Sequence, residues 1–212
     1  MFTKEQVIYH RGRHGVDGIK ENSLPAIYRA VDEGATMIEF DVWEDLKITH
    51  NPNDNPNTPR LGQVLGAIDG RCHVNIEVKS PRMATDVLAT IRGAIKKAGS
   101  KWRIEQFVIS SFHHKTATWF KLHEPMLHVG VIFDGVPDAE YIERLKERGI
   151  DTLHIQWMNA LMDKEGGHDL LDIARTLRMP IWAWTVNDYP TALEMYVYGA
   201  ERIFTDKPEL FA

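Results

Sequence analysis

Three acidic residues lie in alternating segments that are otherwise apolar. Glu39 and Asp41 occur within 37–42, and Glu77 occurs within 74–78. Side chains two residues apart in an extended strand project from the same face, so we expect Glu39 and Asp41 to point the same way and Glu77 to join them. Buried carboxylates that lie close together repel unless a cation compensates them. Three of them suit a hard divalent ion that prefers oxygen ligands, Mg²⁺ or Ca²⁺.

Basic residues accompany these acidic ones. His10 and Arg11 directly follow a short apolar segment, His50 ends the short extended segment 47–49, and Lys79 closes the segment that carries the third carboxylate. Histidine titrates near neutral pH, so His10 and His50 are the natural general acid and base. The alternative is that Arg11 and Lys79 neutralise the carboxylates in a structural ion cluster without a metal. Two histidines beside a set of carboxylates favour catalysis over a structural role.

Short apolar segments that alternate with amphipathic stretches would position these residues. The pattern predicts eight strands, at 7–9, 37–42, 74–78, 107–110, 129–133, 152–155, 181–184 and 202–205. It predicts helices between them, at 23–33, 61–68, 84–98, 115–123, 139–148, 170–177 and 191–198. This alternation indicates a parallel sheet, and its eight strands favour an α/β fold with a closed (β/α)₈ TIM barrel over an open doubly wound sheet. Active sites of such barrels lie at the C-terminal ends of the strands, where the polar residues above occur.

Composition narrows the class of protein further. No break in composition divides the 212 residues, so we expect a single barrel domain over 1–212. A hydrophobic content of 43% excludes an intrinsically disordered chain. The single cysteine, Cys72, excludes an intramolecular disulfide framework and a cysteine-cluster metal site. The net charge of -5 has the wrong sign for a nucleic-acid partner.

The ends and apolar runs of the sequence give no membrane signal. The first residues lack the apolar core of a signal peptide, and no run approaches the roughly 18 to 20 apolar residues that span a bilayer. We therefore expect a cytoplasmic protein without stable membrane insertion.

The motifs around these residues resemble those of the glycerophosphodiester phosphodiesterase family over nearly the whole chain. The matching strings are His10-Arg11-Gly12 with Glu21-Asn22, Gly34 to Val42 with Glu39 and Asp41, His50, Glu77-Val78-Lys79, Trp184-Thr185-Val186-Asn187 and Thr205-Asp206-Lys207-Pro208. Each string is common by itself. All of them in order, on the predicted strands of a barrel, form a specific signal.

The resemblance implies an enzyme that cleaves small-molecule glycerophosphodiesters to glycerol 3-phosphate and an alcohol. A hydroxyl next to the phosphodiester attacks phosphorus in line, while one histidine takes its proton and the other protonates the leaving alcohol. The implied roles are a divalent cation held by Glu39, Asp41 and Glu77, acid and base from His10 and His50, phosphate binding by Arg11 and Lys79, and a pocket wall from Trp184.

The sequence departs from the family pattern in three places. Asn51 follows the second histidine where the family commonly has aspartate, and the loop after His10 is slightly longer than usual. Only 26 residues separate His50 from Glu77, where family members usually carry a small inserted subdomain. The turn-forming stretch 51–59 indicates that this subdomain is largely missing. We therefore expect an open barrel mouth with weak discrimination among leaving alcohols.

Two other functions compete with this one. A related barrel phospholipase, of the lysophospholipase D or sphingomyelinase D type, would expose apolar loops at the mouth, whereas the loops predicted there are polar. A non-catalytic binding barrel would have lost at least one of the histidines or carboxylates, and all five are present. Among the remaining aromatic residues, His154 is expected to be a hydrogen-bonded residue of the barrel interior, and Trp182 is expected to pack beneath a helix.

Overall fold

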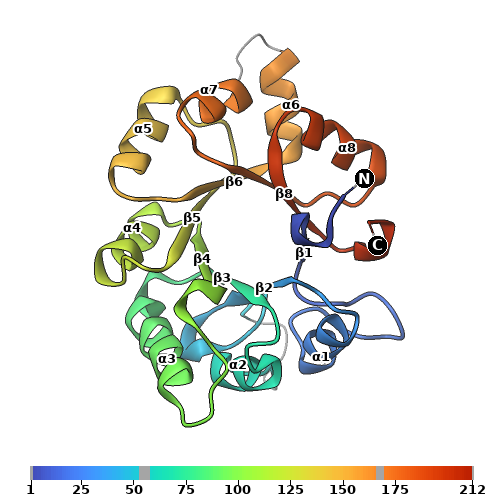
Figure 1. The fold of residues 1–212 in the computed structure, drawn as a ribbon, viewed down its shortest axis with the longest axis vertical. Coiled ribbons are helices and arrows are strands. Elements are labelled where there is room, and N and C mark those ends of the chain that lie inside the picture. Colours follow the sequence, from blue (N-terminus) through green and yellow to red (C-terminus); the bar gives the residue numbers. More distant parts are fainter. Residues whose placement is uncertain (1, 53–57, 166–169, 212) are drawn as a thin grey trace.

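The strands of the computed structural model, which describes residues 2–52, 58–165 and 170–211, form a closed parallel barrel (Figure 1). They follow one another around the barrel in chain order, and β8 pairs back onto β1. The strands are β1 (Val7–Tyr9), β2 (Met37–Val42), β3 (His73–Val78), β4 (Phe107–Ser111), β5 (His128–Phe133), β6 (Thr152–Gln156), β7 (Ile181–Trp184) and β8 (Ala200–Thr205). The predicted (β/α)₈ barrel is confirmed, and the open sheet is excluded.

Helices surround the ring of strands (Figure 1). They are α1 (Leu24–Asp32), α2 (Leu61–Ile68), α3 (Ala84–Lys96), α4 (His114–His123), α5 (Ala139–Glu147), α6 (Trp157–Glu165), α7 (Leu170–Thr176) and α8 (Tyr189–Val197). The sequence pattern misses α6, because this helix begins directly after β6 with no turn or cap residue to mark its start. Among the described helices, none combines the length and the apolar character needed to cross a bilayer.

The two faces of β2 illustrate how alternation builds the barrel. Ile38, Phe40 and Val42 point outward and are fully buried in the core between strands and helices. Glu39 and Asp41 point inward, as the alternation predicts. The apolar outer face therefore anchors the strand, and this anchoring holds the two charged side chains inside the barrel.

Below the charged layer, the barrel interior is mainly apolar and aromatic, and the His154 ring stacks on Trp182 there. The buried apolar residues are Ile8, Met37, Val108, Trp182 and Phe204. The prediction that Trp182 packs beneath a helix is therefore wrong. Residues 182 and 184 lie two apart on β7 and so share the inward face of the strand.

The loop after β1 is fixed against α1. Gly12 adopts a φ of +82°, and a Cβ added there would lie 2.9 Å from the carbonyl carbon of Ala26. Only glycine fits this close approach. The side chain of Ser23 caps the first turn of α1 by accepting a hydrogen bond from the N–H of Ala26. These contacts set the position of the loop that carries His10 and Arg11.

Candidate active site

A cavity of about 150 Å³ opens at the C-terminal ends of the strands. Seven of the eight residues proposed from the sequence line it: His10, Arg11, Glu39, His50, Glu77, Lys79 and Trp184. The eighth, Asp41, is fully buried beside them. The structure therefore brings all the predicted site residues together.

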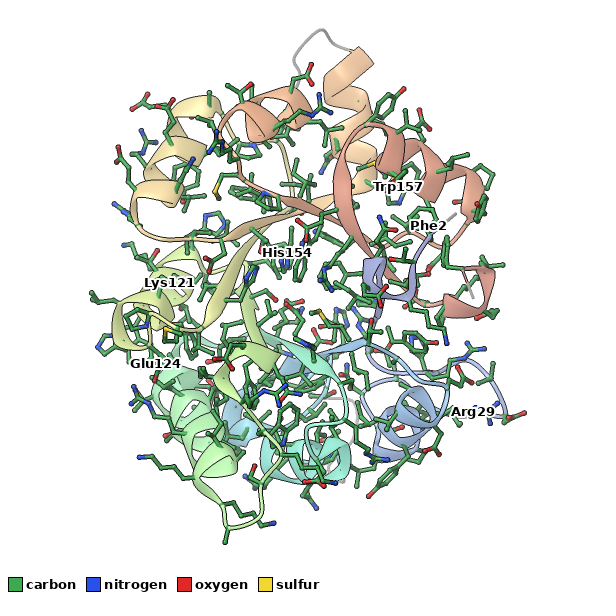
Figure 2. The ribbon with its side chains drawn as sticks, viewed as in Figure 1. Phe2, Arg29, Lys121, Glu124, His154 and Trp157 are labelled. Carbon is green, nitrogen blue, oxygen red and sulfur yellow. The ribbon has the colours of Figure 1, made fainter. Side chains whose placement is uncertain are left out.

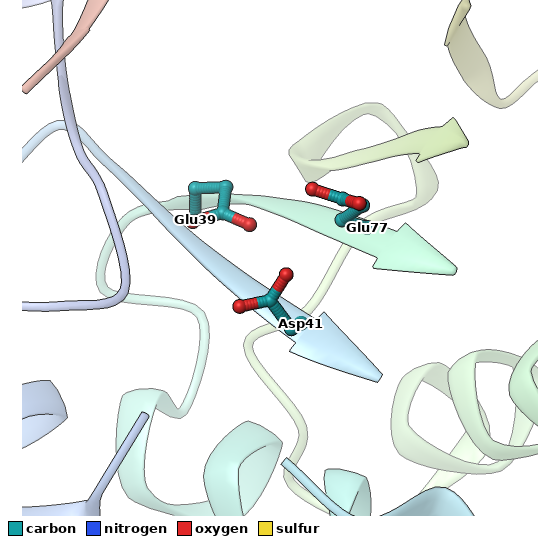
Figure 3. Close-up of side chains that lie close together, drawn as sticks. All are labelled: Glu39, Asp41 and Glu77. Carbon is teal, nitrogen blue, oxygen red and sulfur yellow. The ribbon is translucent and has the colours of Figure 1, made fainter. Parts of the chain in front are cut away.

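The three carboxylates converge inside the barrel (Figure 3). One oxygen from each of Glu39, Asp41 and Glu77 lies within 4.8 Å of the others. Burial and the charges of Asp41 and Glu77 raise the pKa of Glu39 well above its usual range. Burial and the Asp41 charge likewise raise the pKa of Glu77 to about 7. The positive charge around Glu39 and Glu77 is therefore too small to offset their burial and mutual repulsion, so their ionised forms are disfavoured.

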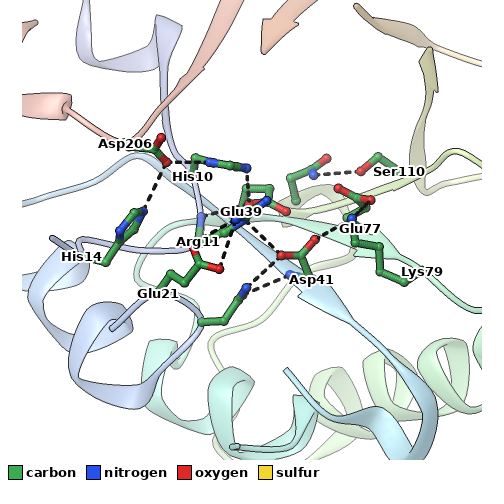
Figure 4. Close-up of polar contacts among 12 residues, drawn as sticks. His10, Arg11, His14, Glu21, Glu39, Asp41, Glu77, Lys79, Ser110 and Asp206 are labelled. Atoms are coloured by element: carbon green, nitrogen blue, oxygen red, sulfur yellow. Dashed lines mark hydrogen bonds and ion pairs between the residues drawn. The ribbon is translucent and has the colours of Figure 1, made fainter. Parts of the chain in front are cut away.

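Lys79 and Arg11 compensate only part of this cluster (Figure 4). The Lys79 Nζ lies 2.6 Å from Glu77 Oε1 and 3.1 Å from Asp41 Oδ1, and the Arg11 Nε lies 3.2 Å from Asp41 Oδ2. Burial alone would raise the pKa of Asp41, but Lys79 and Arg11 lower it below its usual value. A structural ion cluster without a metal would therefore compensate the charge of Asp41 and part of the charge of Glu77.

Glu39 is the carboxylate that this ion cluster leaves short of partners. Its Oε2 accepts a hydrogen bond of 2.9 Å from the backbone N–H of Arg11. Its Oε1 is buried and has no hydrogen-bond partner within the described part of the chain. Buried acceptors without a partner are rare in folded proteins, and a carboxylate oxygen among other carboxylates is a suitable ligand for a hard cation. The residues present fit Mg²⁺ or Ca²⁺.

Two residues of the loop after β1 support the cluster from outside. The Asn22 amide donates to Asp41 Oδ2 at 2.8 Å, and its oxygen accepts from the Asp41 backbone N–H at 3.2 Å. Arg11 Nη1 donates to both oxygens of Glu21, at 3.1 and 3.0 Å. The sequence motif includes Glu21 and Asn22, but their roles become visible only when the loop is seen folded over β2.

His10 is held by a carboxylate from the other end of the chain. Its Nδ1 donates to Asp206 Oδ1 at 2.7 Å, and its Nε2 lies 3.9 Å from Glu39 Oε2 (Figure 4). Asn187 fixes Asp206 by donating to Oδ2 and accepting from the Asp206 backbone N–H, each at 2.8 Å. His14 Nε2 lies 3.2 Å from the same Asp206 oxygen. The arrangement fixes the ring of His10 and leaves Nε2 as its exchangeable nitrogen.

Asp206 is ionised in this network. Burial by itself would raise the pKa of Asp206, but the hydrogen bonds from His10 and His14 lower it far below its usual value. The motif that ends β8 contains Asp206, although the sequence gives no indication that it contacts His10. Closure of the barrel, which places β8 next to β1, creates this contact.

His50 is less constrained than His10. It is exposed, and its backbone carbonyl accepts a hydrogen bond of 2.9 Å from Trp43 Nε1. Burial of part of its ring and the charge of Arg11 lower the pKa of His50. The backbone N–H of Ile48 donates a hydrogen bond of 2.8 Å to the carbonyl of Pro59, which joins the chain before His50 to the chain that leads into α2. The sequence predicts that the segment after His50 does not cover the barrel mouth. Part of this segment, residues 53–57, lies outside the described residues.

Aromatic residues form part of the cavity wall. Trp184 contacts Phe112 edge to face, with 5.7 Å between ring centroids, and the Lys79 Nζ lies 5.7 Å from the Phe112 ring. Trp184 Nε1 donates to the carbonyl of His154 at 3.1 Å. Phe112 was not singled out from the sequence, and the available signal was its position directly after β4.

His154 lies inside the ring of strands (Figure 2), as predicted. Its Nε2 lies 3.2 Å from Thr152 Oγ1, whereas its Nδ1 is buried without a hydrogen-bond partner among the described residues. Burial lowers the pKa of His154 to about 3, so the ring is uncharged at neutral pH. The expectation that its hydrogen bonds are satisfied holds for one nitrogen only.

One side of the barrel mouth carries three exposed apolar side chains that the prediction of polar loops did not include. Phe112 follows β4, Val136 follows β5 and Met158 follows β6, and these side chains are 41%, 42% and 45% exposed. The prediction missed them because they lie in three separate segments of the chain, with one exposed apolar residue in each. Only their shared place at the C-terminal ends of adjacent strands makes them one rim, which we call the apolar rim.

Known proteins resemble this chain in sequence and in fold. The model of the glycerophosphoryl diester phosphodiesterase family matches residues 43–210. A glycerophosphodiester phosphodiesterase from Parabacteroides distasonis is 23% identical with a TM-score of 0.77, over 96% of this chain and 93% of that one. A search of curated protein sequences gives no match.

Two further solved structures share the fold. A phosphodiesterase from Oleispira antarctica, solved with its product sn-glycerol-3-phosphate, is 22% identical with a TM-score of 0.77, over 96% of this chain and 94% of that one. A glycerophosphodiester phosphodiesterase from Thermotoga maritima is 21% identical with a TM-score of 0.76, over 97% and 96%. The family match covers more than half of the chain, so this phosphodiesterase belongs to the glycerophosphoryl diester phosphodiesterase family, as its motifs predict.

Proposed function

We propose that this enzyme hydrolyses glycerophosphodiesters to glycerol 3-phosphate and an alcohol, as a single domain over residues 1–212 that acts in the cytoplasm. The observation that carries the proposal is the position of His10, which Asp206 orients beside three buried carboxylates in one cavity. The glycerol 3-phosphate product in the relative from Oleispira antarctica supports this choice of substrate.

A divalent cation, Mg²⁺ or Ca²⁺, would be held by Glu39, Asp41 and Glu77. When bound, such an ion supplies positive charge to the phosphoryl oxygens and lowers the pKa of a coordinated hydroxyl. Support for this role comes from the unpartnered Glu39 Oε1 and from the raised pKa values of Glu39 and Glu77. Both features are relieved by added positive charge, and Lys79 and Arg11 do not reach Glu39 Oε1.

Arg11 and Lys79 would bind the phosphate. The contacts of Arg11 with carboxylates use Nε and Nη1, which leaves Nη2 for a phosphoryl oxygen. The Lys79 ammonium lines the cavity while it contacts Asp41 and Glu77, and it carries three protons. Charge-assisted hydrogen bonds from these groups favour the phosphodiester anion and the additional charge that develops in the transition state.

His10 and His50 would transfer the protons. Asp206 accepts the Nδ1 proton of His10, so this ring exchanges protons with the substrate through Nε2. His50 lies at the edge of the same cavity. One ring accepts the proton of the attacking hydroxyl and the other donates to the leaving alcohol, which gives a cyclic phosphate. Water then opens this cyclic phosphate to glycerol 3-phosphate, with the two rings exchanging roles. Trp184 would contact the organic part of the substrate.

The apolar rim supports a second candidate, a barrel phospholipase that removes the head group of a lysophospholipid. Phe112, Val136 and Met158 would contact the acyl chain, whereas a glycerophosphodiester has no chain to place there. The phosphoryl chemistry and the residues that perform it are the same for both substrates.

A product assay separates the two candidates. Metal-depleted enzyme is restored with Mg²⁺ or Ca²⁺ and supplied with glycerophosphocholine or lysophosphatidylcholine, with His10→Ala as the inactive control. We expect glycerol 3-phosphate and choline from the first substrate at the higher kcat/KM. Lysophosphatidate formed at the higher kcat/KM would replace the proposed function with the second candidate. Activity on neither substrate would contradict both.

A further inference from the structure

Asn75 is a polar residue of the barrel interior that the proposed mechanism does not use. It lies on β3, two residues before Glu77, and therefore shares the inward face of the strand. Its Cα pairs in register with that of Glu39 on β2. The side chain is 1% exposed and lines the active-site cavity. Asn75 is thus a direct neighbour of two of the three carboxylates.

The two ends of the Asn75 amide have different surroundings. The Nδ2 group donates to Ser110 Oγ on β4 at 2.9 Å, and Ser110 is itself fully buried. The Oδ1 atom is buried and accepts no hydrogen bond from any described residue. Ser110 therefore holds the amide by its nitrogen and leaves its oxygen without a partner in a residue that lines the cavity.

An unpartnered acceptor next to carboxylates is unfavourable unless a positive group is present. If carboxylates were its only neighbours, the amide would be more stable with its NH₂ group toward them, because the hydroxyl of Ser110 can either donate or accept. Lys79 cannot supply the charge, because its ammonium is engaged by Asp41 and Glu77. The orientation of the amide matches a cation, for which neutral carbonyl oxygens are ordinary ligands.

We propose that Asn75 Oδ1 is a fourth protein oxygen of the cation site, contacting the ion or a water in its coordination shell, with Ser110 as the residue that orients it. This inference rests on the proposed function, because it requires that Glu39, Asp41 and Glu77 hold a divalent ion. It adds a neutral donor, which strengthens the site without adding a fourth mutually repelling charge. Asn75 is a residue of the ion site rather than a proton donor or acceptor.

Isothermal titration of the intact metal-depleted protein with Ca²⁺ and, separately, Mg²⁺ tests the proposal without an activity assay. Asn75→Leu keeps most of the side-chain volume and removes the oxygen. We expect the Kd of the ion that the wild type binds to rise about 10- to 100-fold, the usual range for supporting groups of a metal site. Circular dichroism checks the fold, and Asn75→Ser replaces Asn75→Leu if the leucine variant does not fold.

Two further variants make the result specific. Thr152→Val removes another buried polar group inside the barrel, next to His154 on β6, and should leave the Kd unchanged. Glu39→Gln should abolish ion binding. If Glu39→Gln abolishes binding and the folded Asn75 variant binds like the wild type, the inference about Asn75 is wrong and the metal site stands. If the wild type binds neither ion, both are wrong. An equal loss in Thr152→Val would reduce the role of Asn75 to general packing.

Discussion

The two halves of the barrel mouth differ in the kind of side chain that they present and in how firmly those side chains are fixed. Over β1, β2, β3 and β8, the cavity is lined mainly by charged and polar side chains, and several groups there have fixed partners: Asp206 holds His10, and Asn22 holds the buried Asp41. Over β4, β5 and β6, exposed apolar side chains (Phe112, Val136 and Met158) lie among exposed polar ones such as His113 and Asp134. The first half is a network of polar side chains with fixed partners, and the second carries separate exposed apolar side chains.

The difference indicates that the two halves have separate roles, catalysis in the charged half and substrate preference in the apolar rim. Catalytic groups must be held in place before the substrate arrives, because positioning during the reaction would cost part of the rate enhancement. Apolar contacts are less directional, so a rim of separate side chains can accept several shapes. We therefore expect changes in the charged half to lower kcat for every substrate, and changes in the apolar rim to alter the preference among substrates.

The largest effect should come from the cation site. Chelation should abolish turnover, and Glu39→Gln should lower kcat/KM by about 10³-fold or more, because ion stabilisation of phosphoryl charge contributes several kcal/mol. Glu77→Gln should weaken ion binding. Activity is measured in excess chelator and after restoration with Mg²⁺ or Ca²⁺. Full activity in excess chelator would exclude the cation from the mechanism.

The second-largest effect should come from the two histidines, His10 and His50. His10→Ala and His50→Ala should each lower kcat by at least about 10²-fold, the usual contribution of a positioned acid or base. Steady-state kinetics with unchanged circular dichroism checks this. His73→Ala, an exposed histidine at the start of β3, is the matched control. A histidine variant with near-wild-type kcat would remove that residue from proton transfer.

Asp206→Asn tests the support of His10 rather than the histidine itself. An asparagine at this position no longer favours the same ring orientation and tautomer, so we expect kcat to fall about 10- to 100-fold. The dependence of kcat on pH should change as well, whereas KM should change little. An unaltered pH profile would mean that Asp206 is only a structural residue.

Stability of the metal-free protein should depend on pH through Glu77. Its pKa is raised from 4.5 to about 7 in the folded state, so its favourable contribution is complete below about pH 4.5 and is lost as the pH rises through 7. Between pH 5.5 and 8, urea denaturation in chelator should show an extra loss of unfolding free energy on the order of 1 to 3 kcal/mol.

Glu77→Gln should remove most of this loss, because an amide cannot ionise. Glu147→Gln changes an exposed glutamate on α5 and should behave like the wild type. If the wild type and Glu77→Gln lose equal stability between the two pH values, the carboxylate cluster is not under the electrostatic stress inferred for it.

The smallest effect should come from the apolar rim. Phe112→Ala should lower kcat/KM about tenfold for a diester with a bulky apolar alcohol and leave glycerophosphocholine within about twofold, because the loss is one apolar contact. Leu122→Ala, an exposed residue on α4, is the control. Equal losses on both substrates would place Phe112 in the catalytic half rather than in a surface for substrate selection.

Local patterns predicted the frame and much of the site. Strand periodicity placed Glu39 and Asp41 inside the barrel, since side chains on a strand alternate whatever the strand pairs with. By the same rule Trp182 and Trp184 share the inward face of β7, which is why the prediction that Trp182 packs beneath a helix is wrong. The sequence pattern does not predict the helix α6, because this helix follows β6 without a turn or cap residue that would mark its start.

Contacts between distant segments were decided only by the tertiary structure. His10 and Asp206 are 196 residues apart and meet because β8 closes onto β1. Asn75 became a neighbour of Glu39 through the register of β2 and β3. The apolar rim exists because the C-terminal ends of β4, β5 and β6 lie next to one another at the mouth of the barrel. Alternation is a property of a single strand and can be read locally, whereas register and closure depend on the packing of the whole chain.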